Sequence, residues 1–226
     1  AIAVLSLIFR GAMLTDARLP ALKRLAWVWC LLNGLLAIAV FNRMFVYVGF
    51  NGLTHMRIVG LFGISAVVAG FALVVWKIAR QRDFLWLVSR QLRALAIVIL
   101  LYALTPVDAI AAGYNVRRIL AGDSAAVMQI GVQPIDTEGI LVLPPLLDCE
   151  DPEIRSGIRA LLAEQYQQLE TRHSEQTALG WTARQFVDDY ALKRLRPHAS
   201  QWGDYEDDTA RRNALKKFRD YAYQWY

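Results

Sequence analysis

The chain has 226 residues, of which 56% are hydrophobic, and a mean hydropathy of +0.29, which exceeds what an ordinary soluble domain carries. Its net charge of +5 is unevenly distributed, because residues 1–112 carry +8 and residues 113–226 carry −3. The basic excess flanks apolar segments while the second half is slightly acidic, so we expect no nucleic-acid partner.

The first nine residues are apolar and begin with Ala1 rather than Met. No basic stretch precedes them, which a signal peptide would require. We interpret them as part of an earlier membrane helix or as the product of maturation.

Three apolar segments follow, at residues 25–41, 58–76 and 94–113. At about 1.5 Å per residue, helices of these lengths reach about 25–30 Å, the thickness of the hydrocarbon core. The second segment contains no charged residue, whereas a soluble helix would show a polar stripe. The sequence therefore predicts a transmembrane domain over residues 1–113, in contact with the lipid bilayer.

Lys and Arg are unequally divided between the two sides of these predicted spans. One side carries nine of them, before the first span and in the loop between the second and third, and the other side carries four. The positive-inside rule places the nine-charge side in the cytoplasm and the C-terminal half outside it.

Asp108 lies near the end of the third predicted span, where an acid is costly unless it is paired or hydrated. Two interpretations stay open. Arg57 and Asp108 form a structural ion pair that locks the second and third spans, or Asp108 serves as a proton or cation site with Tyr102 and Asn115 nearby.

The second span also carries two overlapping patterns of small residues. In one pattern Ser65 is followed four residues later by Ala69, and in the other Ala66 is followed four residues later by Gly70. Small residues let helix backbones approach closely in a membrane, and we expect this face to pack within the chain rather than form a homodimer.

The segments YVGFNGLTHMR at residues 47–57, YALTPVD at 102–108 and YNVR at 114–117 resemble an uncharacterised family of bacterial multi-pass inner-membrane proteins, known as a domain of unknown function. The resemblance covers roughly residues 20–160. It implies a bacterial inner (plasma) membrane location with further spans upstream. It implies no activity, and no catalytic residue carries over from it.

Residues 114–150 form a connector, in which apolar runs at 127–132 and 139–143 are compatible with short β pieces. Residues 151–226 are predicted to form a small soluble helical domain. Asp151, followed by Pro at the first helical position, favours a helix start. The fold class is therefore mainly α, with about three transmembrane helices before this domain.

Two further helices complete the predicted domain. One opens at a capping-box pattern over residues 182–185 and the other near Asp208. The former helix shows an apolar stripe, which we expect to face the core, formed by Phe186, Tyr190, Ala191 and Leu195.

No pattern in the sequence points to chemistry. It contains no phosphate-binding glycine loop, nucleophile motif or metal-ligand spacing, so we expect no cofactor and assign no catalytic or metal site. Cys30 and Cys149 lie in different halves and are not expected to pair. We interpret Asp188 and Asp189 as solvated or helix-start acids.

Three functions remain open. The first is a membrane-anchored scaffold or accessory subunit that presents the C-terminal helical domain to a protein partner. The second is a transport or sensing component that uses Asp108, and the third, which is least favoured because no site motif occurs, is a membrane-bound enzyme.

Overall fold

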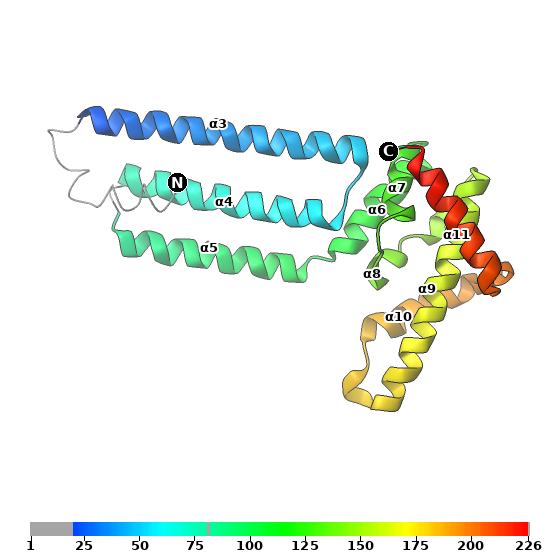
Figure 1. Cartoon of the computed structure of the whole chain (residues 1–226). Coiled ribbons are helices and arrows are strands. Elements are labelled where there is room, and N and C mark those ends of the chain that lie inside the picture. The colour runs from blue at the N-terminus through cyan, green and yellow to red at the C-terminus, as the bar shows by residue number, and fades with distance from the viewer. Residues whose placement is uncertain (1–19, 81, 226) are drawn as a thin grey trace. The chain divides into compact units, whose positions relative to one another are not determined.

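The computed structural model describes residues 20–80 and 82–225, and these residues form helices joined by short turns (Figure 1). The mainly α fold class is confirmed, and no strand occurs within the two described ranges. The first of the two predicted β pieces lies in helix α7 (Val127–Gly131), and the second lies in α8 (Thr137–Ile140) and the turn after it. Apolar runs this short fit a helix or a strand equally well by periodicity, which is why the sequence left the choice open.

The chain folds as two compact units. The span unit comprises Ala1–Val46 and Met56–Thr105, and the polar unit comprises Tyr47–His55 and Pro106–Tyr226. The short connection between the first two long helices therefore belongs to the polar unit, although it lies far from the rest of that unit in the sequence.

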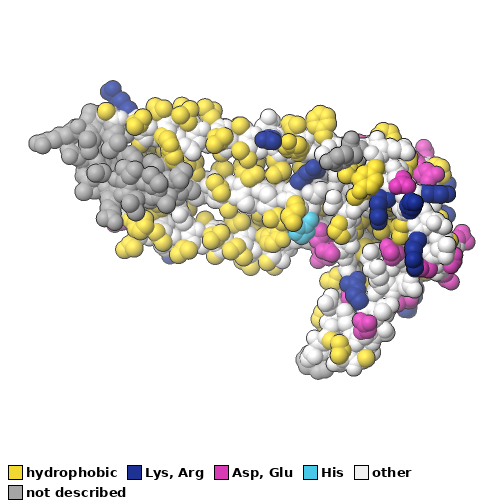
Figure 2. All heavy atoms as spheres, viewed as in Figure 1, with side chains coloured by type: hydrophobic (Ala, Val, Ile, Leu, Met, Phe, Trp, Pro, Cys, Tyr) yellow, Lys and Arg dark blue, Asp and Glu magenta, His cyan; other side chains and the backbone are white. Residues whose placement is uncertain are grey.

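Within residues 20–80 and 82–225, three helices are long and apolar enough to cross a membrane (Figure 1). They are α3 (Pro20–Asn51), α4 (His55–Arg80) and α5 (Phe84–Leu104). Figure 2 shows hydrophobic side chains over much of the visible face of these helices. Leu31 and Ile38 of α3, for example, are 64% and 67% exposed. Apolar side chains directed outward over whole helices suit a lipid environment rather than water.

The first two predicted spans lie within α3 and α4, but the third prediction was wrong at both ends. Helix α5 begins at Phe84 and ends at Leu104, and a separate helix, α6, occupies Val107–Leu120. Pro106 explains the break, because it has no backbone N–H to donate and it disfavours helical geometry at the preceding residue. Asp108 therefore lies in the first turn of α6 rather than inside a span.

The polar unit continues from α6 through a series of short and long helices. Its remaining elements are η1 (Ser124–Ala126), α7, α8, η2 (Pro144–Asp148), α9 (Pro152–Leu179), η3 (Trp181–Ala183), α10 (Phe186–Leu195), η4 (Arg196–Gln201), η5 (Gly203–Tyr205) and α11 (Asp208–Tyr223). One apolar core joins them, and its fully buried members include Ile140, Leu143, Leu146, Ile158, Leu162, Leu169, Leu195 and Phe218.

Helices α9 and α11 approach closely where a glycine meets an aromatic ring. A Cβ atom added at Gly157 would collide with the ring of Phe218, which is 2% exposed.

The N-terminus of α9 is capped as predicted, because the Asp151 carboxylate accepts hydrogen bonds from the backbone N–H groups of Glu153 at 2.8 Å and Ile154 at 3.3 Å. The Tyr221 hydroxyl of α11 donates to the same carboxylate at 2.6 Å.

The start of α10 differs from its prediction. The capping-box residues 182–185 do not cap a helix; α10 begins at Phe186, and Gln185 at its N-cap makes no side-chain cap bond. The predicted apolar stripe is also divided between two environments. Ala191 and Leu195 are buried in the core, whereas Phe186 and Tyr190 are 89% and 59% exposed.

The second half of α9, η3 and α10 together form a helical hairpin, which we call the arm. In Figure 1 it extends away from α11 within the polar unit, with α9 in yellow and α10 in orange. The two sides are tied together near the tip, where the backbone N–H of Gln185 donates to the Gln176 side chain at 3.3 Å.

Candidate functional site

Asn115 of α6 holds the connection between α3 and α4. Its side-chain oxygen accepts a hydrogen bond from the Leu53 N–H at 2.9 Å, and its side-chain nitrogen donates to the Leu53 carbonyl at 2.7 Å. Asn115 is 2% exposed and Leu53 is 9% exposed. One carboxamide thus satisfies both backbone groups of a buried loop residue.

Gly52 is required beside this contact. Its φ is +78°, in the left-handed region that L side chains rarely adopt, and an added Cβ would lie 2.5 Å from Asn115 Oδ1. The family-like segment at residues 47–57 therefore includes a tight turn that only glycine accommodates.

Two more side chains bind the same loop. Gln129 Nε2 donates to the Asn51 carbonyl at 2.6 Å, and Arg118 Nη1 donates to the Val48 carbonyl at 3.0 Å. Arg118 is itself held by Asp123, with its Nε 2.8 Å from Asp123 Oδ2. We call Asn115, Arg118 and Gln129, with the loop backbone they bind, the loop clasp.

Asp108 pairs with His55 beside the loop clasp. His55 Nδ1 lies 2.9 Å from Asp108 Oδ1, and the side chains are 42% and 23% exposed. The carboxylate also lies in the first turn of α6, where the helix dipole favours negative charge. The pairing of Asp108 with Arg57, which the sequence suggested, stays a prediction.

Tyr102, another predicted site residue, lies in α5. Its ring packs edge to face against Phe62 of α4, with 5.7 Å between the ring centroids and 73° between the planes. This contact makes Tyr102 part of the packing between two spans.

Of the four small residues predicted to pack helices, Ser65 is exposed, and Ala66, Ala69 and Gly70 are half-buried. A close approach between α3 and α4 occurs at another glycine, Gly60. A Cβ at Gly60 would be 3.0 Å from the Met44 side chain of α3.

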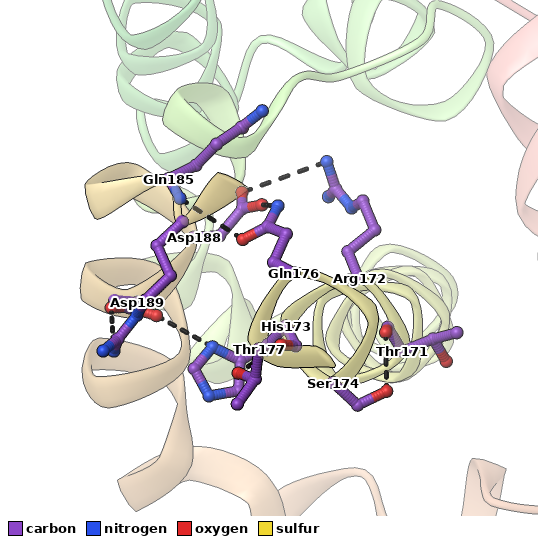
Figure 3. Close-up of polar contacts among 10 residues, drawn as sticks. Thr171, Arg172, His173, Ser174, Gln176, Thr177, Gln185, Asp188 and Asp189 are labelled. Atoms are coloured by element: carbon purple, nitrogen blue, oxygen red, sulfur yellow. Dashed lines mark hydrogen bonds and ion pairs between the residues drawn. The ribbon is translucent and has the colours of Figure 1, made fainter. Parts of the chain in front are cut away.

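A second polar cluster, which the sequence did not single out, holds the arm. Asp188 of α10 is 1% exposed, so the interpretation of this residue as a solvated acid was wrong, although it does lie in the first turn of its helix. Thr137 Oγ1 donates to one carboxylate oxygen at 3.2 Å and Gln176 Nε2 donates to the other at 3.0 Å, as Figure 3 shows for Gln176. Arg172 Nη1 lies 3.9 Å away and supplies opposite charge. A buried carboxylate is tolerated only with such partners.

The neighbouring Asp189 points in a different direction from Asp188 (Figure 3). It accepts a hydrogen bond from Arg184 at 2.7 Å, and its other oxygen lies 2.8 Å from His173 Nδ1. The latter two atoms are close but do not meet the geometry of a hydrogen bond. These residues open onto a cleft of about 640 Å³, the arm cleft, whose charged or titratable lining residues are Glu170, His173, Arg184, Asp189, Lys193 and Arg196.

Neither cluster has the composition of a metal centre. In residues 20–80 and 82–225, no group of three or more His, Cys, Asp or Glu side chains is arranged to hold a metal ion. Cys30 and Cys149 are both buried free thiols, as expected from their separation in the sequence.

Comparison with known families identifies the first part of the chain. Residues 1–139 match the family described as Domain of unknown function (DUF4153). No curated protein matches the chain, and no solved structure does so. The family match includes α3, α4 and α5 and the loop clasp, and it ends before α9. Because it covers more than half of the sequence, the expectation of an uncharacterised family is confirmed, and the chain belongs to the DUF4153 family.

Proposed function

We propose that this protein is a membrane-anchored scaffold or accessory subunit, in which α3, α4 and α5 anchor the chain and the arm presents a binding surface to a protein partner. The observation that carries the proposal is the buried Asp188, because its partners Thr137, Gln176 and Arg172 join α8, α9 and α10. Burying a carboxylate costs free energy, and the hydrogen bonds and the opposite charge around Asp188 offset that cost. Because these contacts hold three helices together, we assign Asp188 a structural role in the arm.

The arm cleft is the partner-binding surface in this proposal. Its exposed cations Arg184, Lys193 and Arg196 outnumber the acids Glu170 and Asp189. A partner with an acidic segment would complement this surface, and such complementarity steers association and selects the partner.

We further propose that the chain is a multi-pass protein of the bacterial inner membrane with its polar unit outside the cytoplasm. The uneven division of Lys and Arg supports this orientation. A reporter enzyme that is active only outside the cytoplasm, fused after Tyr226, tests it. Activity of the fusion is the expected result, and an inactive but stable fusion contradicts the orientation.

Purification in a mild detergent tests the scaffold proposal. We expect a stoichiometric protein partner to copurify with the parent chain and to be lost from a Lys193→Glu, Arg196→Glu variant, since the added negative charges repel an acidic segment. Lys217→Glu, at an exposed position of α11, is the matched control and should retain the partner. Recovery of the parent chain alone, or equal retention by the charge-reversed variant, contradicts the proposal.

The contact between His55 and Asp108 favours a second candidate, a transport or sensing component. His55 is the first residue of α4 and Asp108 lies in the first turn of α6, and their ionisable side chains are 2.9 Å apart, from Nδ1 to Oδ1. A proton can be exchanged across such a pair. An Asp108→Asn variant that is stable and has an unaltered cellular phenotype would remove the support for this candidate. The third candidate, a membrane-bound enzyme, gains no support from the clusters described above.

A further inference from the structure

Helix α10 has three distinct faces. Asp188, Ala191 and Leu195 face the core, while Asp189 and Lys193 line the arm cleft. The remaining face carries Phe186, Val187 and Tyr190, which are 89%, 40% and 59% exposed. We call these three residues the apolar strip. Large apolar side chains gathered on one exposed face mark a surface that interacts with a membrane or with another molecule.

The apolar strip borders a groove of about 530 Å³ within the polar unit. Leu141 and Val142, which follow α8, line the groove together with Pro106 and Ala109 at the start of α6. Arg194, one turn beyond Tyr190 on α10, adds a cation to the same lining, and Glu138 of α8 adds an acid.

The covalent chain brings this groove close to a membrane-crossing helix. Leu104 is the last residue of α5, and Pro106 in the groove follows it by two residues. Because consecutive Cα atoms are about 3.8 Å apart, Pro106 lies within about 8 Å of the end of α5 in any arrangement of the two units. A helix that crosses a bilayer ends where hydrocarbon gives way to headgroups, so Pro106, which lines the groove, lies near that level.

We propose that the apolar strip rests on the lipid bilayer, at the boundary between the headgroups and the acyl chains. Tyr is a residue of the aromatic belts found at this depth, and Phe is typical of the apolar face of helices that lie in the interface. Arg194 can keep its charge among the headgroups while its stem lies along the apolar surface. Lipid is the proposed occupant because Pro106 of the groove follows, by only two residues, the end of a helix long and apolar enough to cross a bilayer. The contact fixes the arm beside the membrane and leaves the charged face of α10 in water.

Spin labelling of the full chain in nanodiscs of phosphatidylcholine and phosphatidylglycerol tests this proposal. Phe186→Cys and Lys193→Cys place a nitroxide on the strip and on the charged face of the same helix, in a chain whose buried Cys30 and Cys149 are replaced by alanine. Both labelled positions are exposed, so neither label disturbs the core, and circular dichroism checks that helix content matches that of the parent.

Collisions with oxygen, which concentrates in the bilayer, are compared with collisions with a nickel chelate, which stays in water. At position 186 we expect oxygen collisions to exceed nickel collisions several-fold, and at position 193 we expect the reverse. Equal access of the nickel chelate to both positions would overturn the proposal. Shielding of position 186 from both reagents would also overturn it, because protein rather than lipid would then cover the strip.

Discussion

Replacing Asn115 with alanine tests the loop clasp directly. The change removes two hydrogen bonds and leaves the N–H and carbonyl of Leu53 buried without these partners. An unsatisfied buried group costs about 1–3 kcal/mol, so the two together cost about 2–4 kcal/mol once water enters part of the vacated space. Since about 1.4 kcal/mol is a tenfold change in an equilibrium, the loop should open about 30-fold to 700-fold more often.

Hydrogen exchange of the peptide that contains residues 47–55, measured on the full chain in nanodiscs, reports this opening. We expect faster exchange there in the Asn115→Ala variant and parent-like exchange in the core of α9. Asn213→Ala, an exposed asparagine of α11, is the matched control and should change nothing in the loop. Parent-like exchange of residues 47–55 in Asn115→Ala would refute the structural role assigned to this carboxamide.

Three further predictions concern the polar unit. Asp188→Ala leaves the donors around it unpaired and should destabilise the unit by about 1–3 kcal/mol, seen as a lower melting temperature, whereas an unchanged melting temperature would contradict the network. Gly157→Ala forces a Cβ into the ring of Phe218 and should cost about 1–3 kcal/mol by overpacking, again measured by thermal unfolding. Burial raises the pKa of Asp151, but the Tyr221 hydroxyl and two backbone N–H groups outweigh it and hold that pKa below its ordinary value. The resulting stability is present above about pH 4 and is lost as pH falls through the lowered folded pKa, so Tyr221→Phe should lose less stability on acidification than the parent does.

The span helices and several helix starts could be predicted because their signals are local. The length of the charge-free segment at residues 58–76 identifies α4, and an acidic N-cap followed by proline identifies the start of α9 at Asp151. Pro106 was also a local signal, since the residue before proline avoids the helical region. The largely apolar character of residues 94–113, with Asp108 as its one charged residue, outweighed it, and the end of α5 was therefore misplaced.

The polar clusters could not be predicted because their partners are distant in the chain. Asn115 and Leu53 are 62 residues apart, and Thr137 and Asp188 are 51 apart. Helical periodicity gives Phe186 and Ala191 as one apolar stripe of α10, yet only tertiary packing decides that one is exposed and the other buried. The sequence therefore named Asn115 and Asp108 as candidate residues but could not assign the contacts that each makes.

The claim on which the remaining proposals depend is that α3, α4 and α5 reside in a lipid bilayer. Extraction of cell membranes that contain the chain with alkaline carbonate, compared with extraction in detergent, measures this most directly. We expect the chain to stay in the membrane pellet after carbonate and to dissolve only in detergent. Its release by carbonate as a monodisperse particle free of lipid would contradict the membrane assignment.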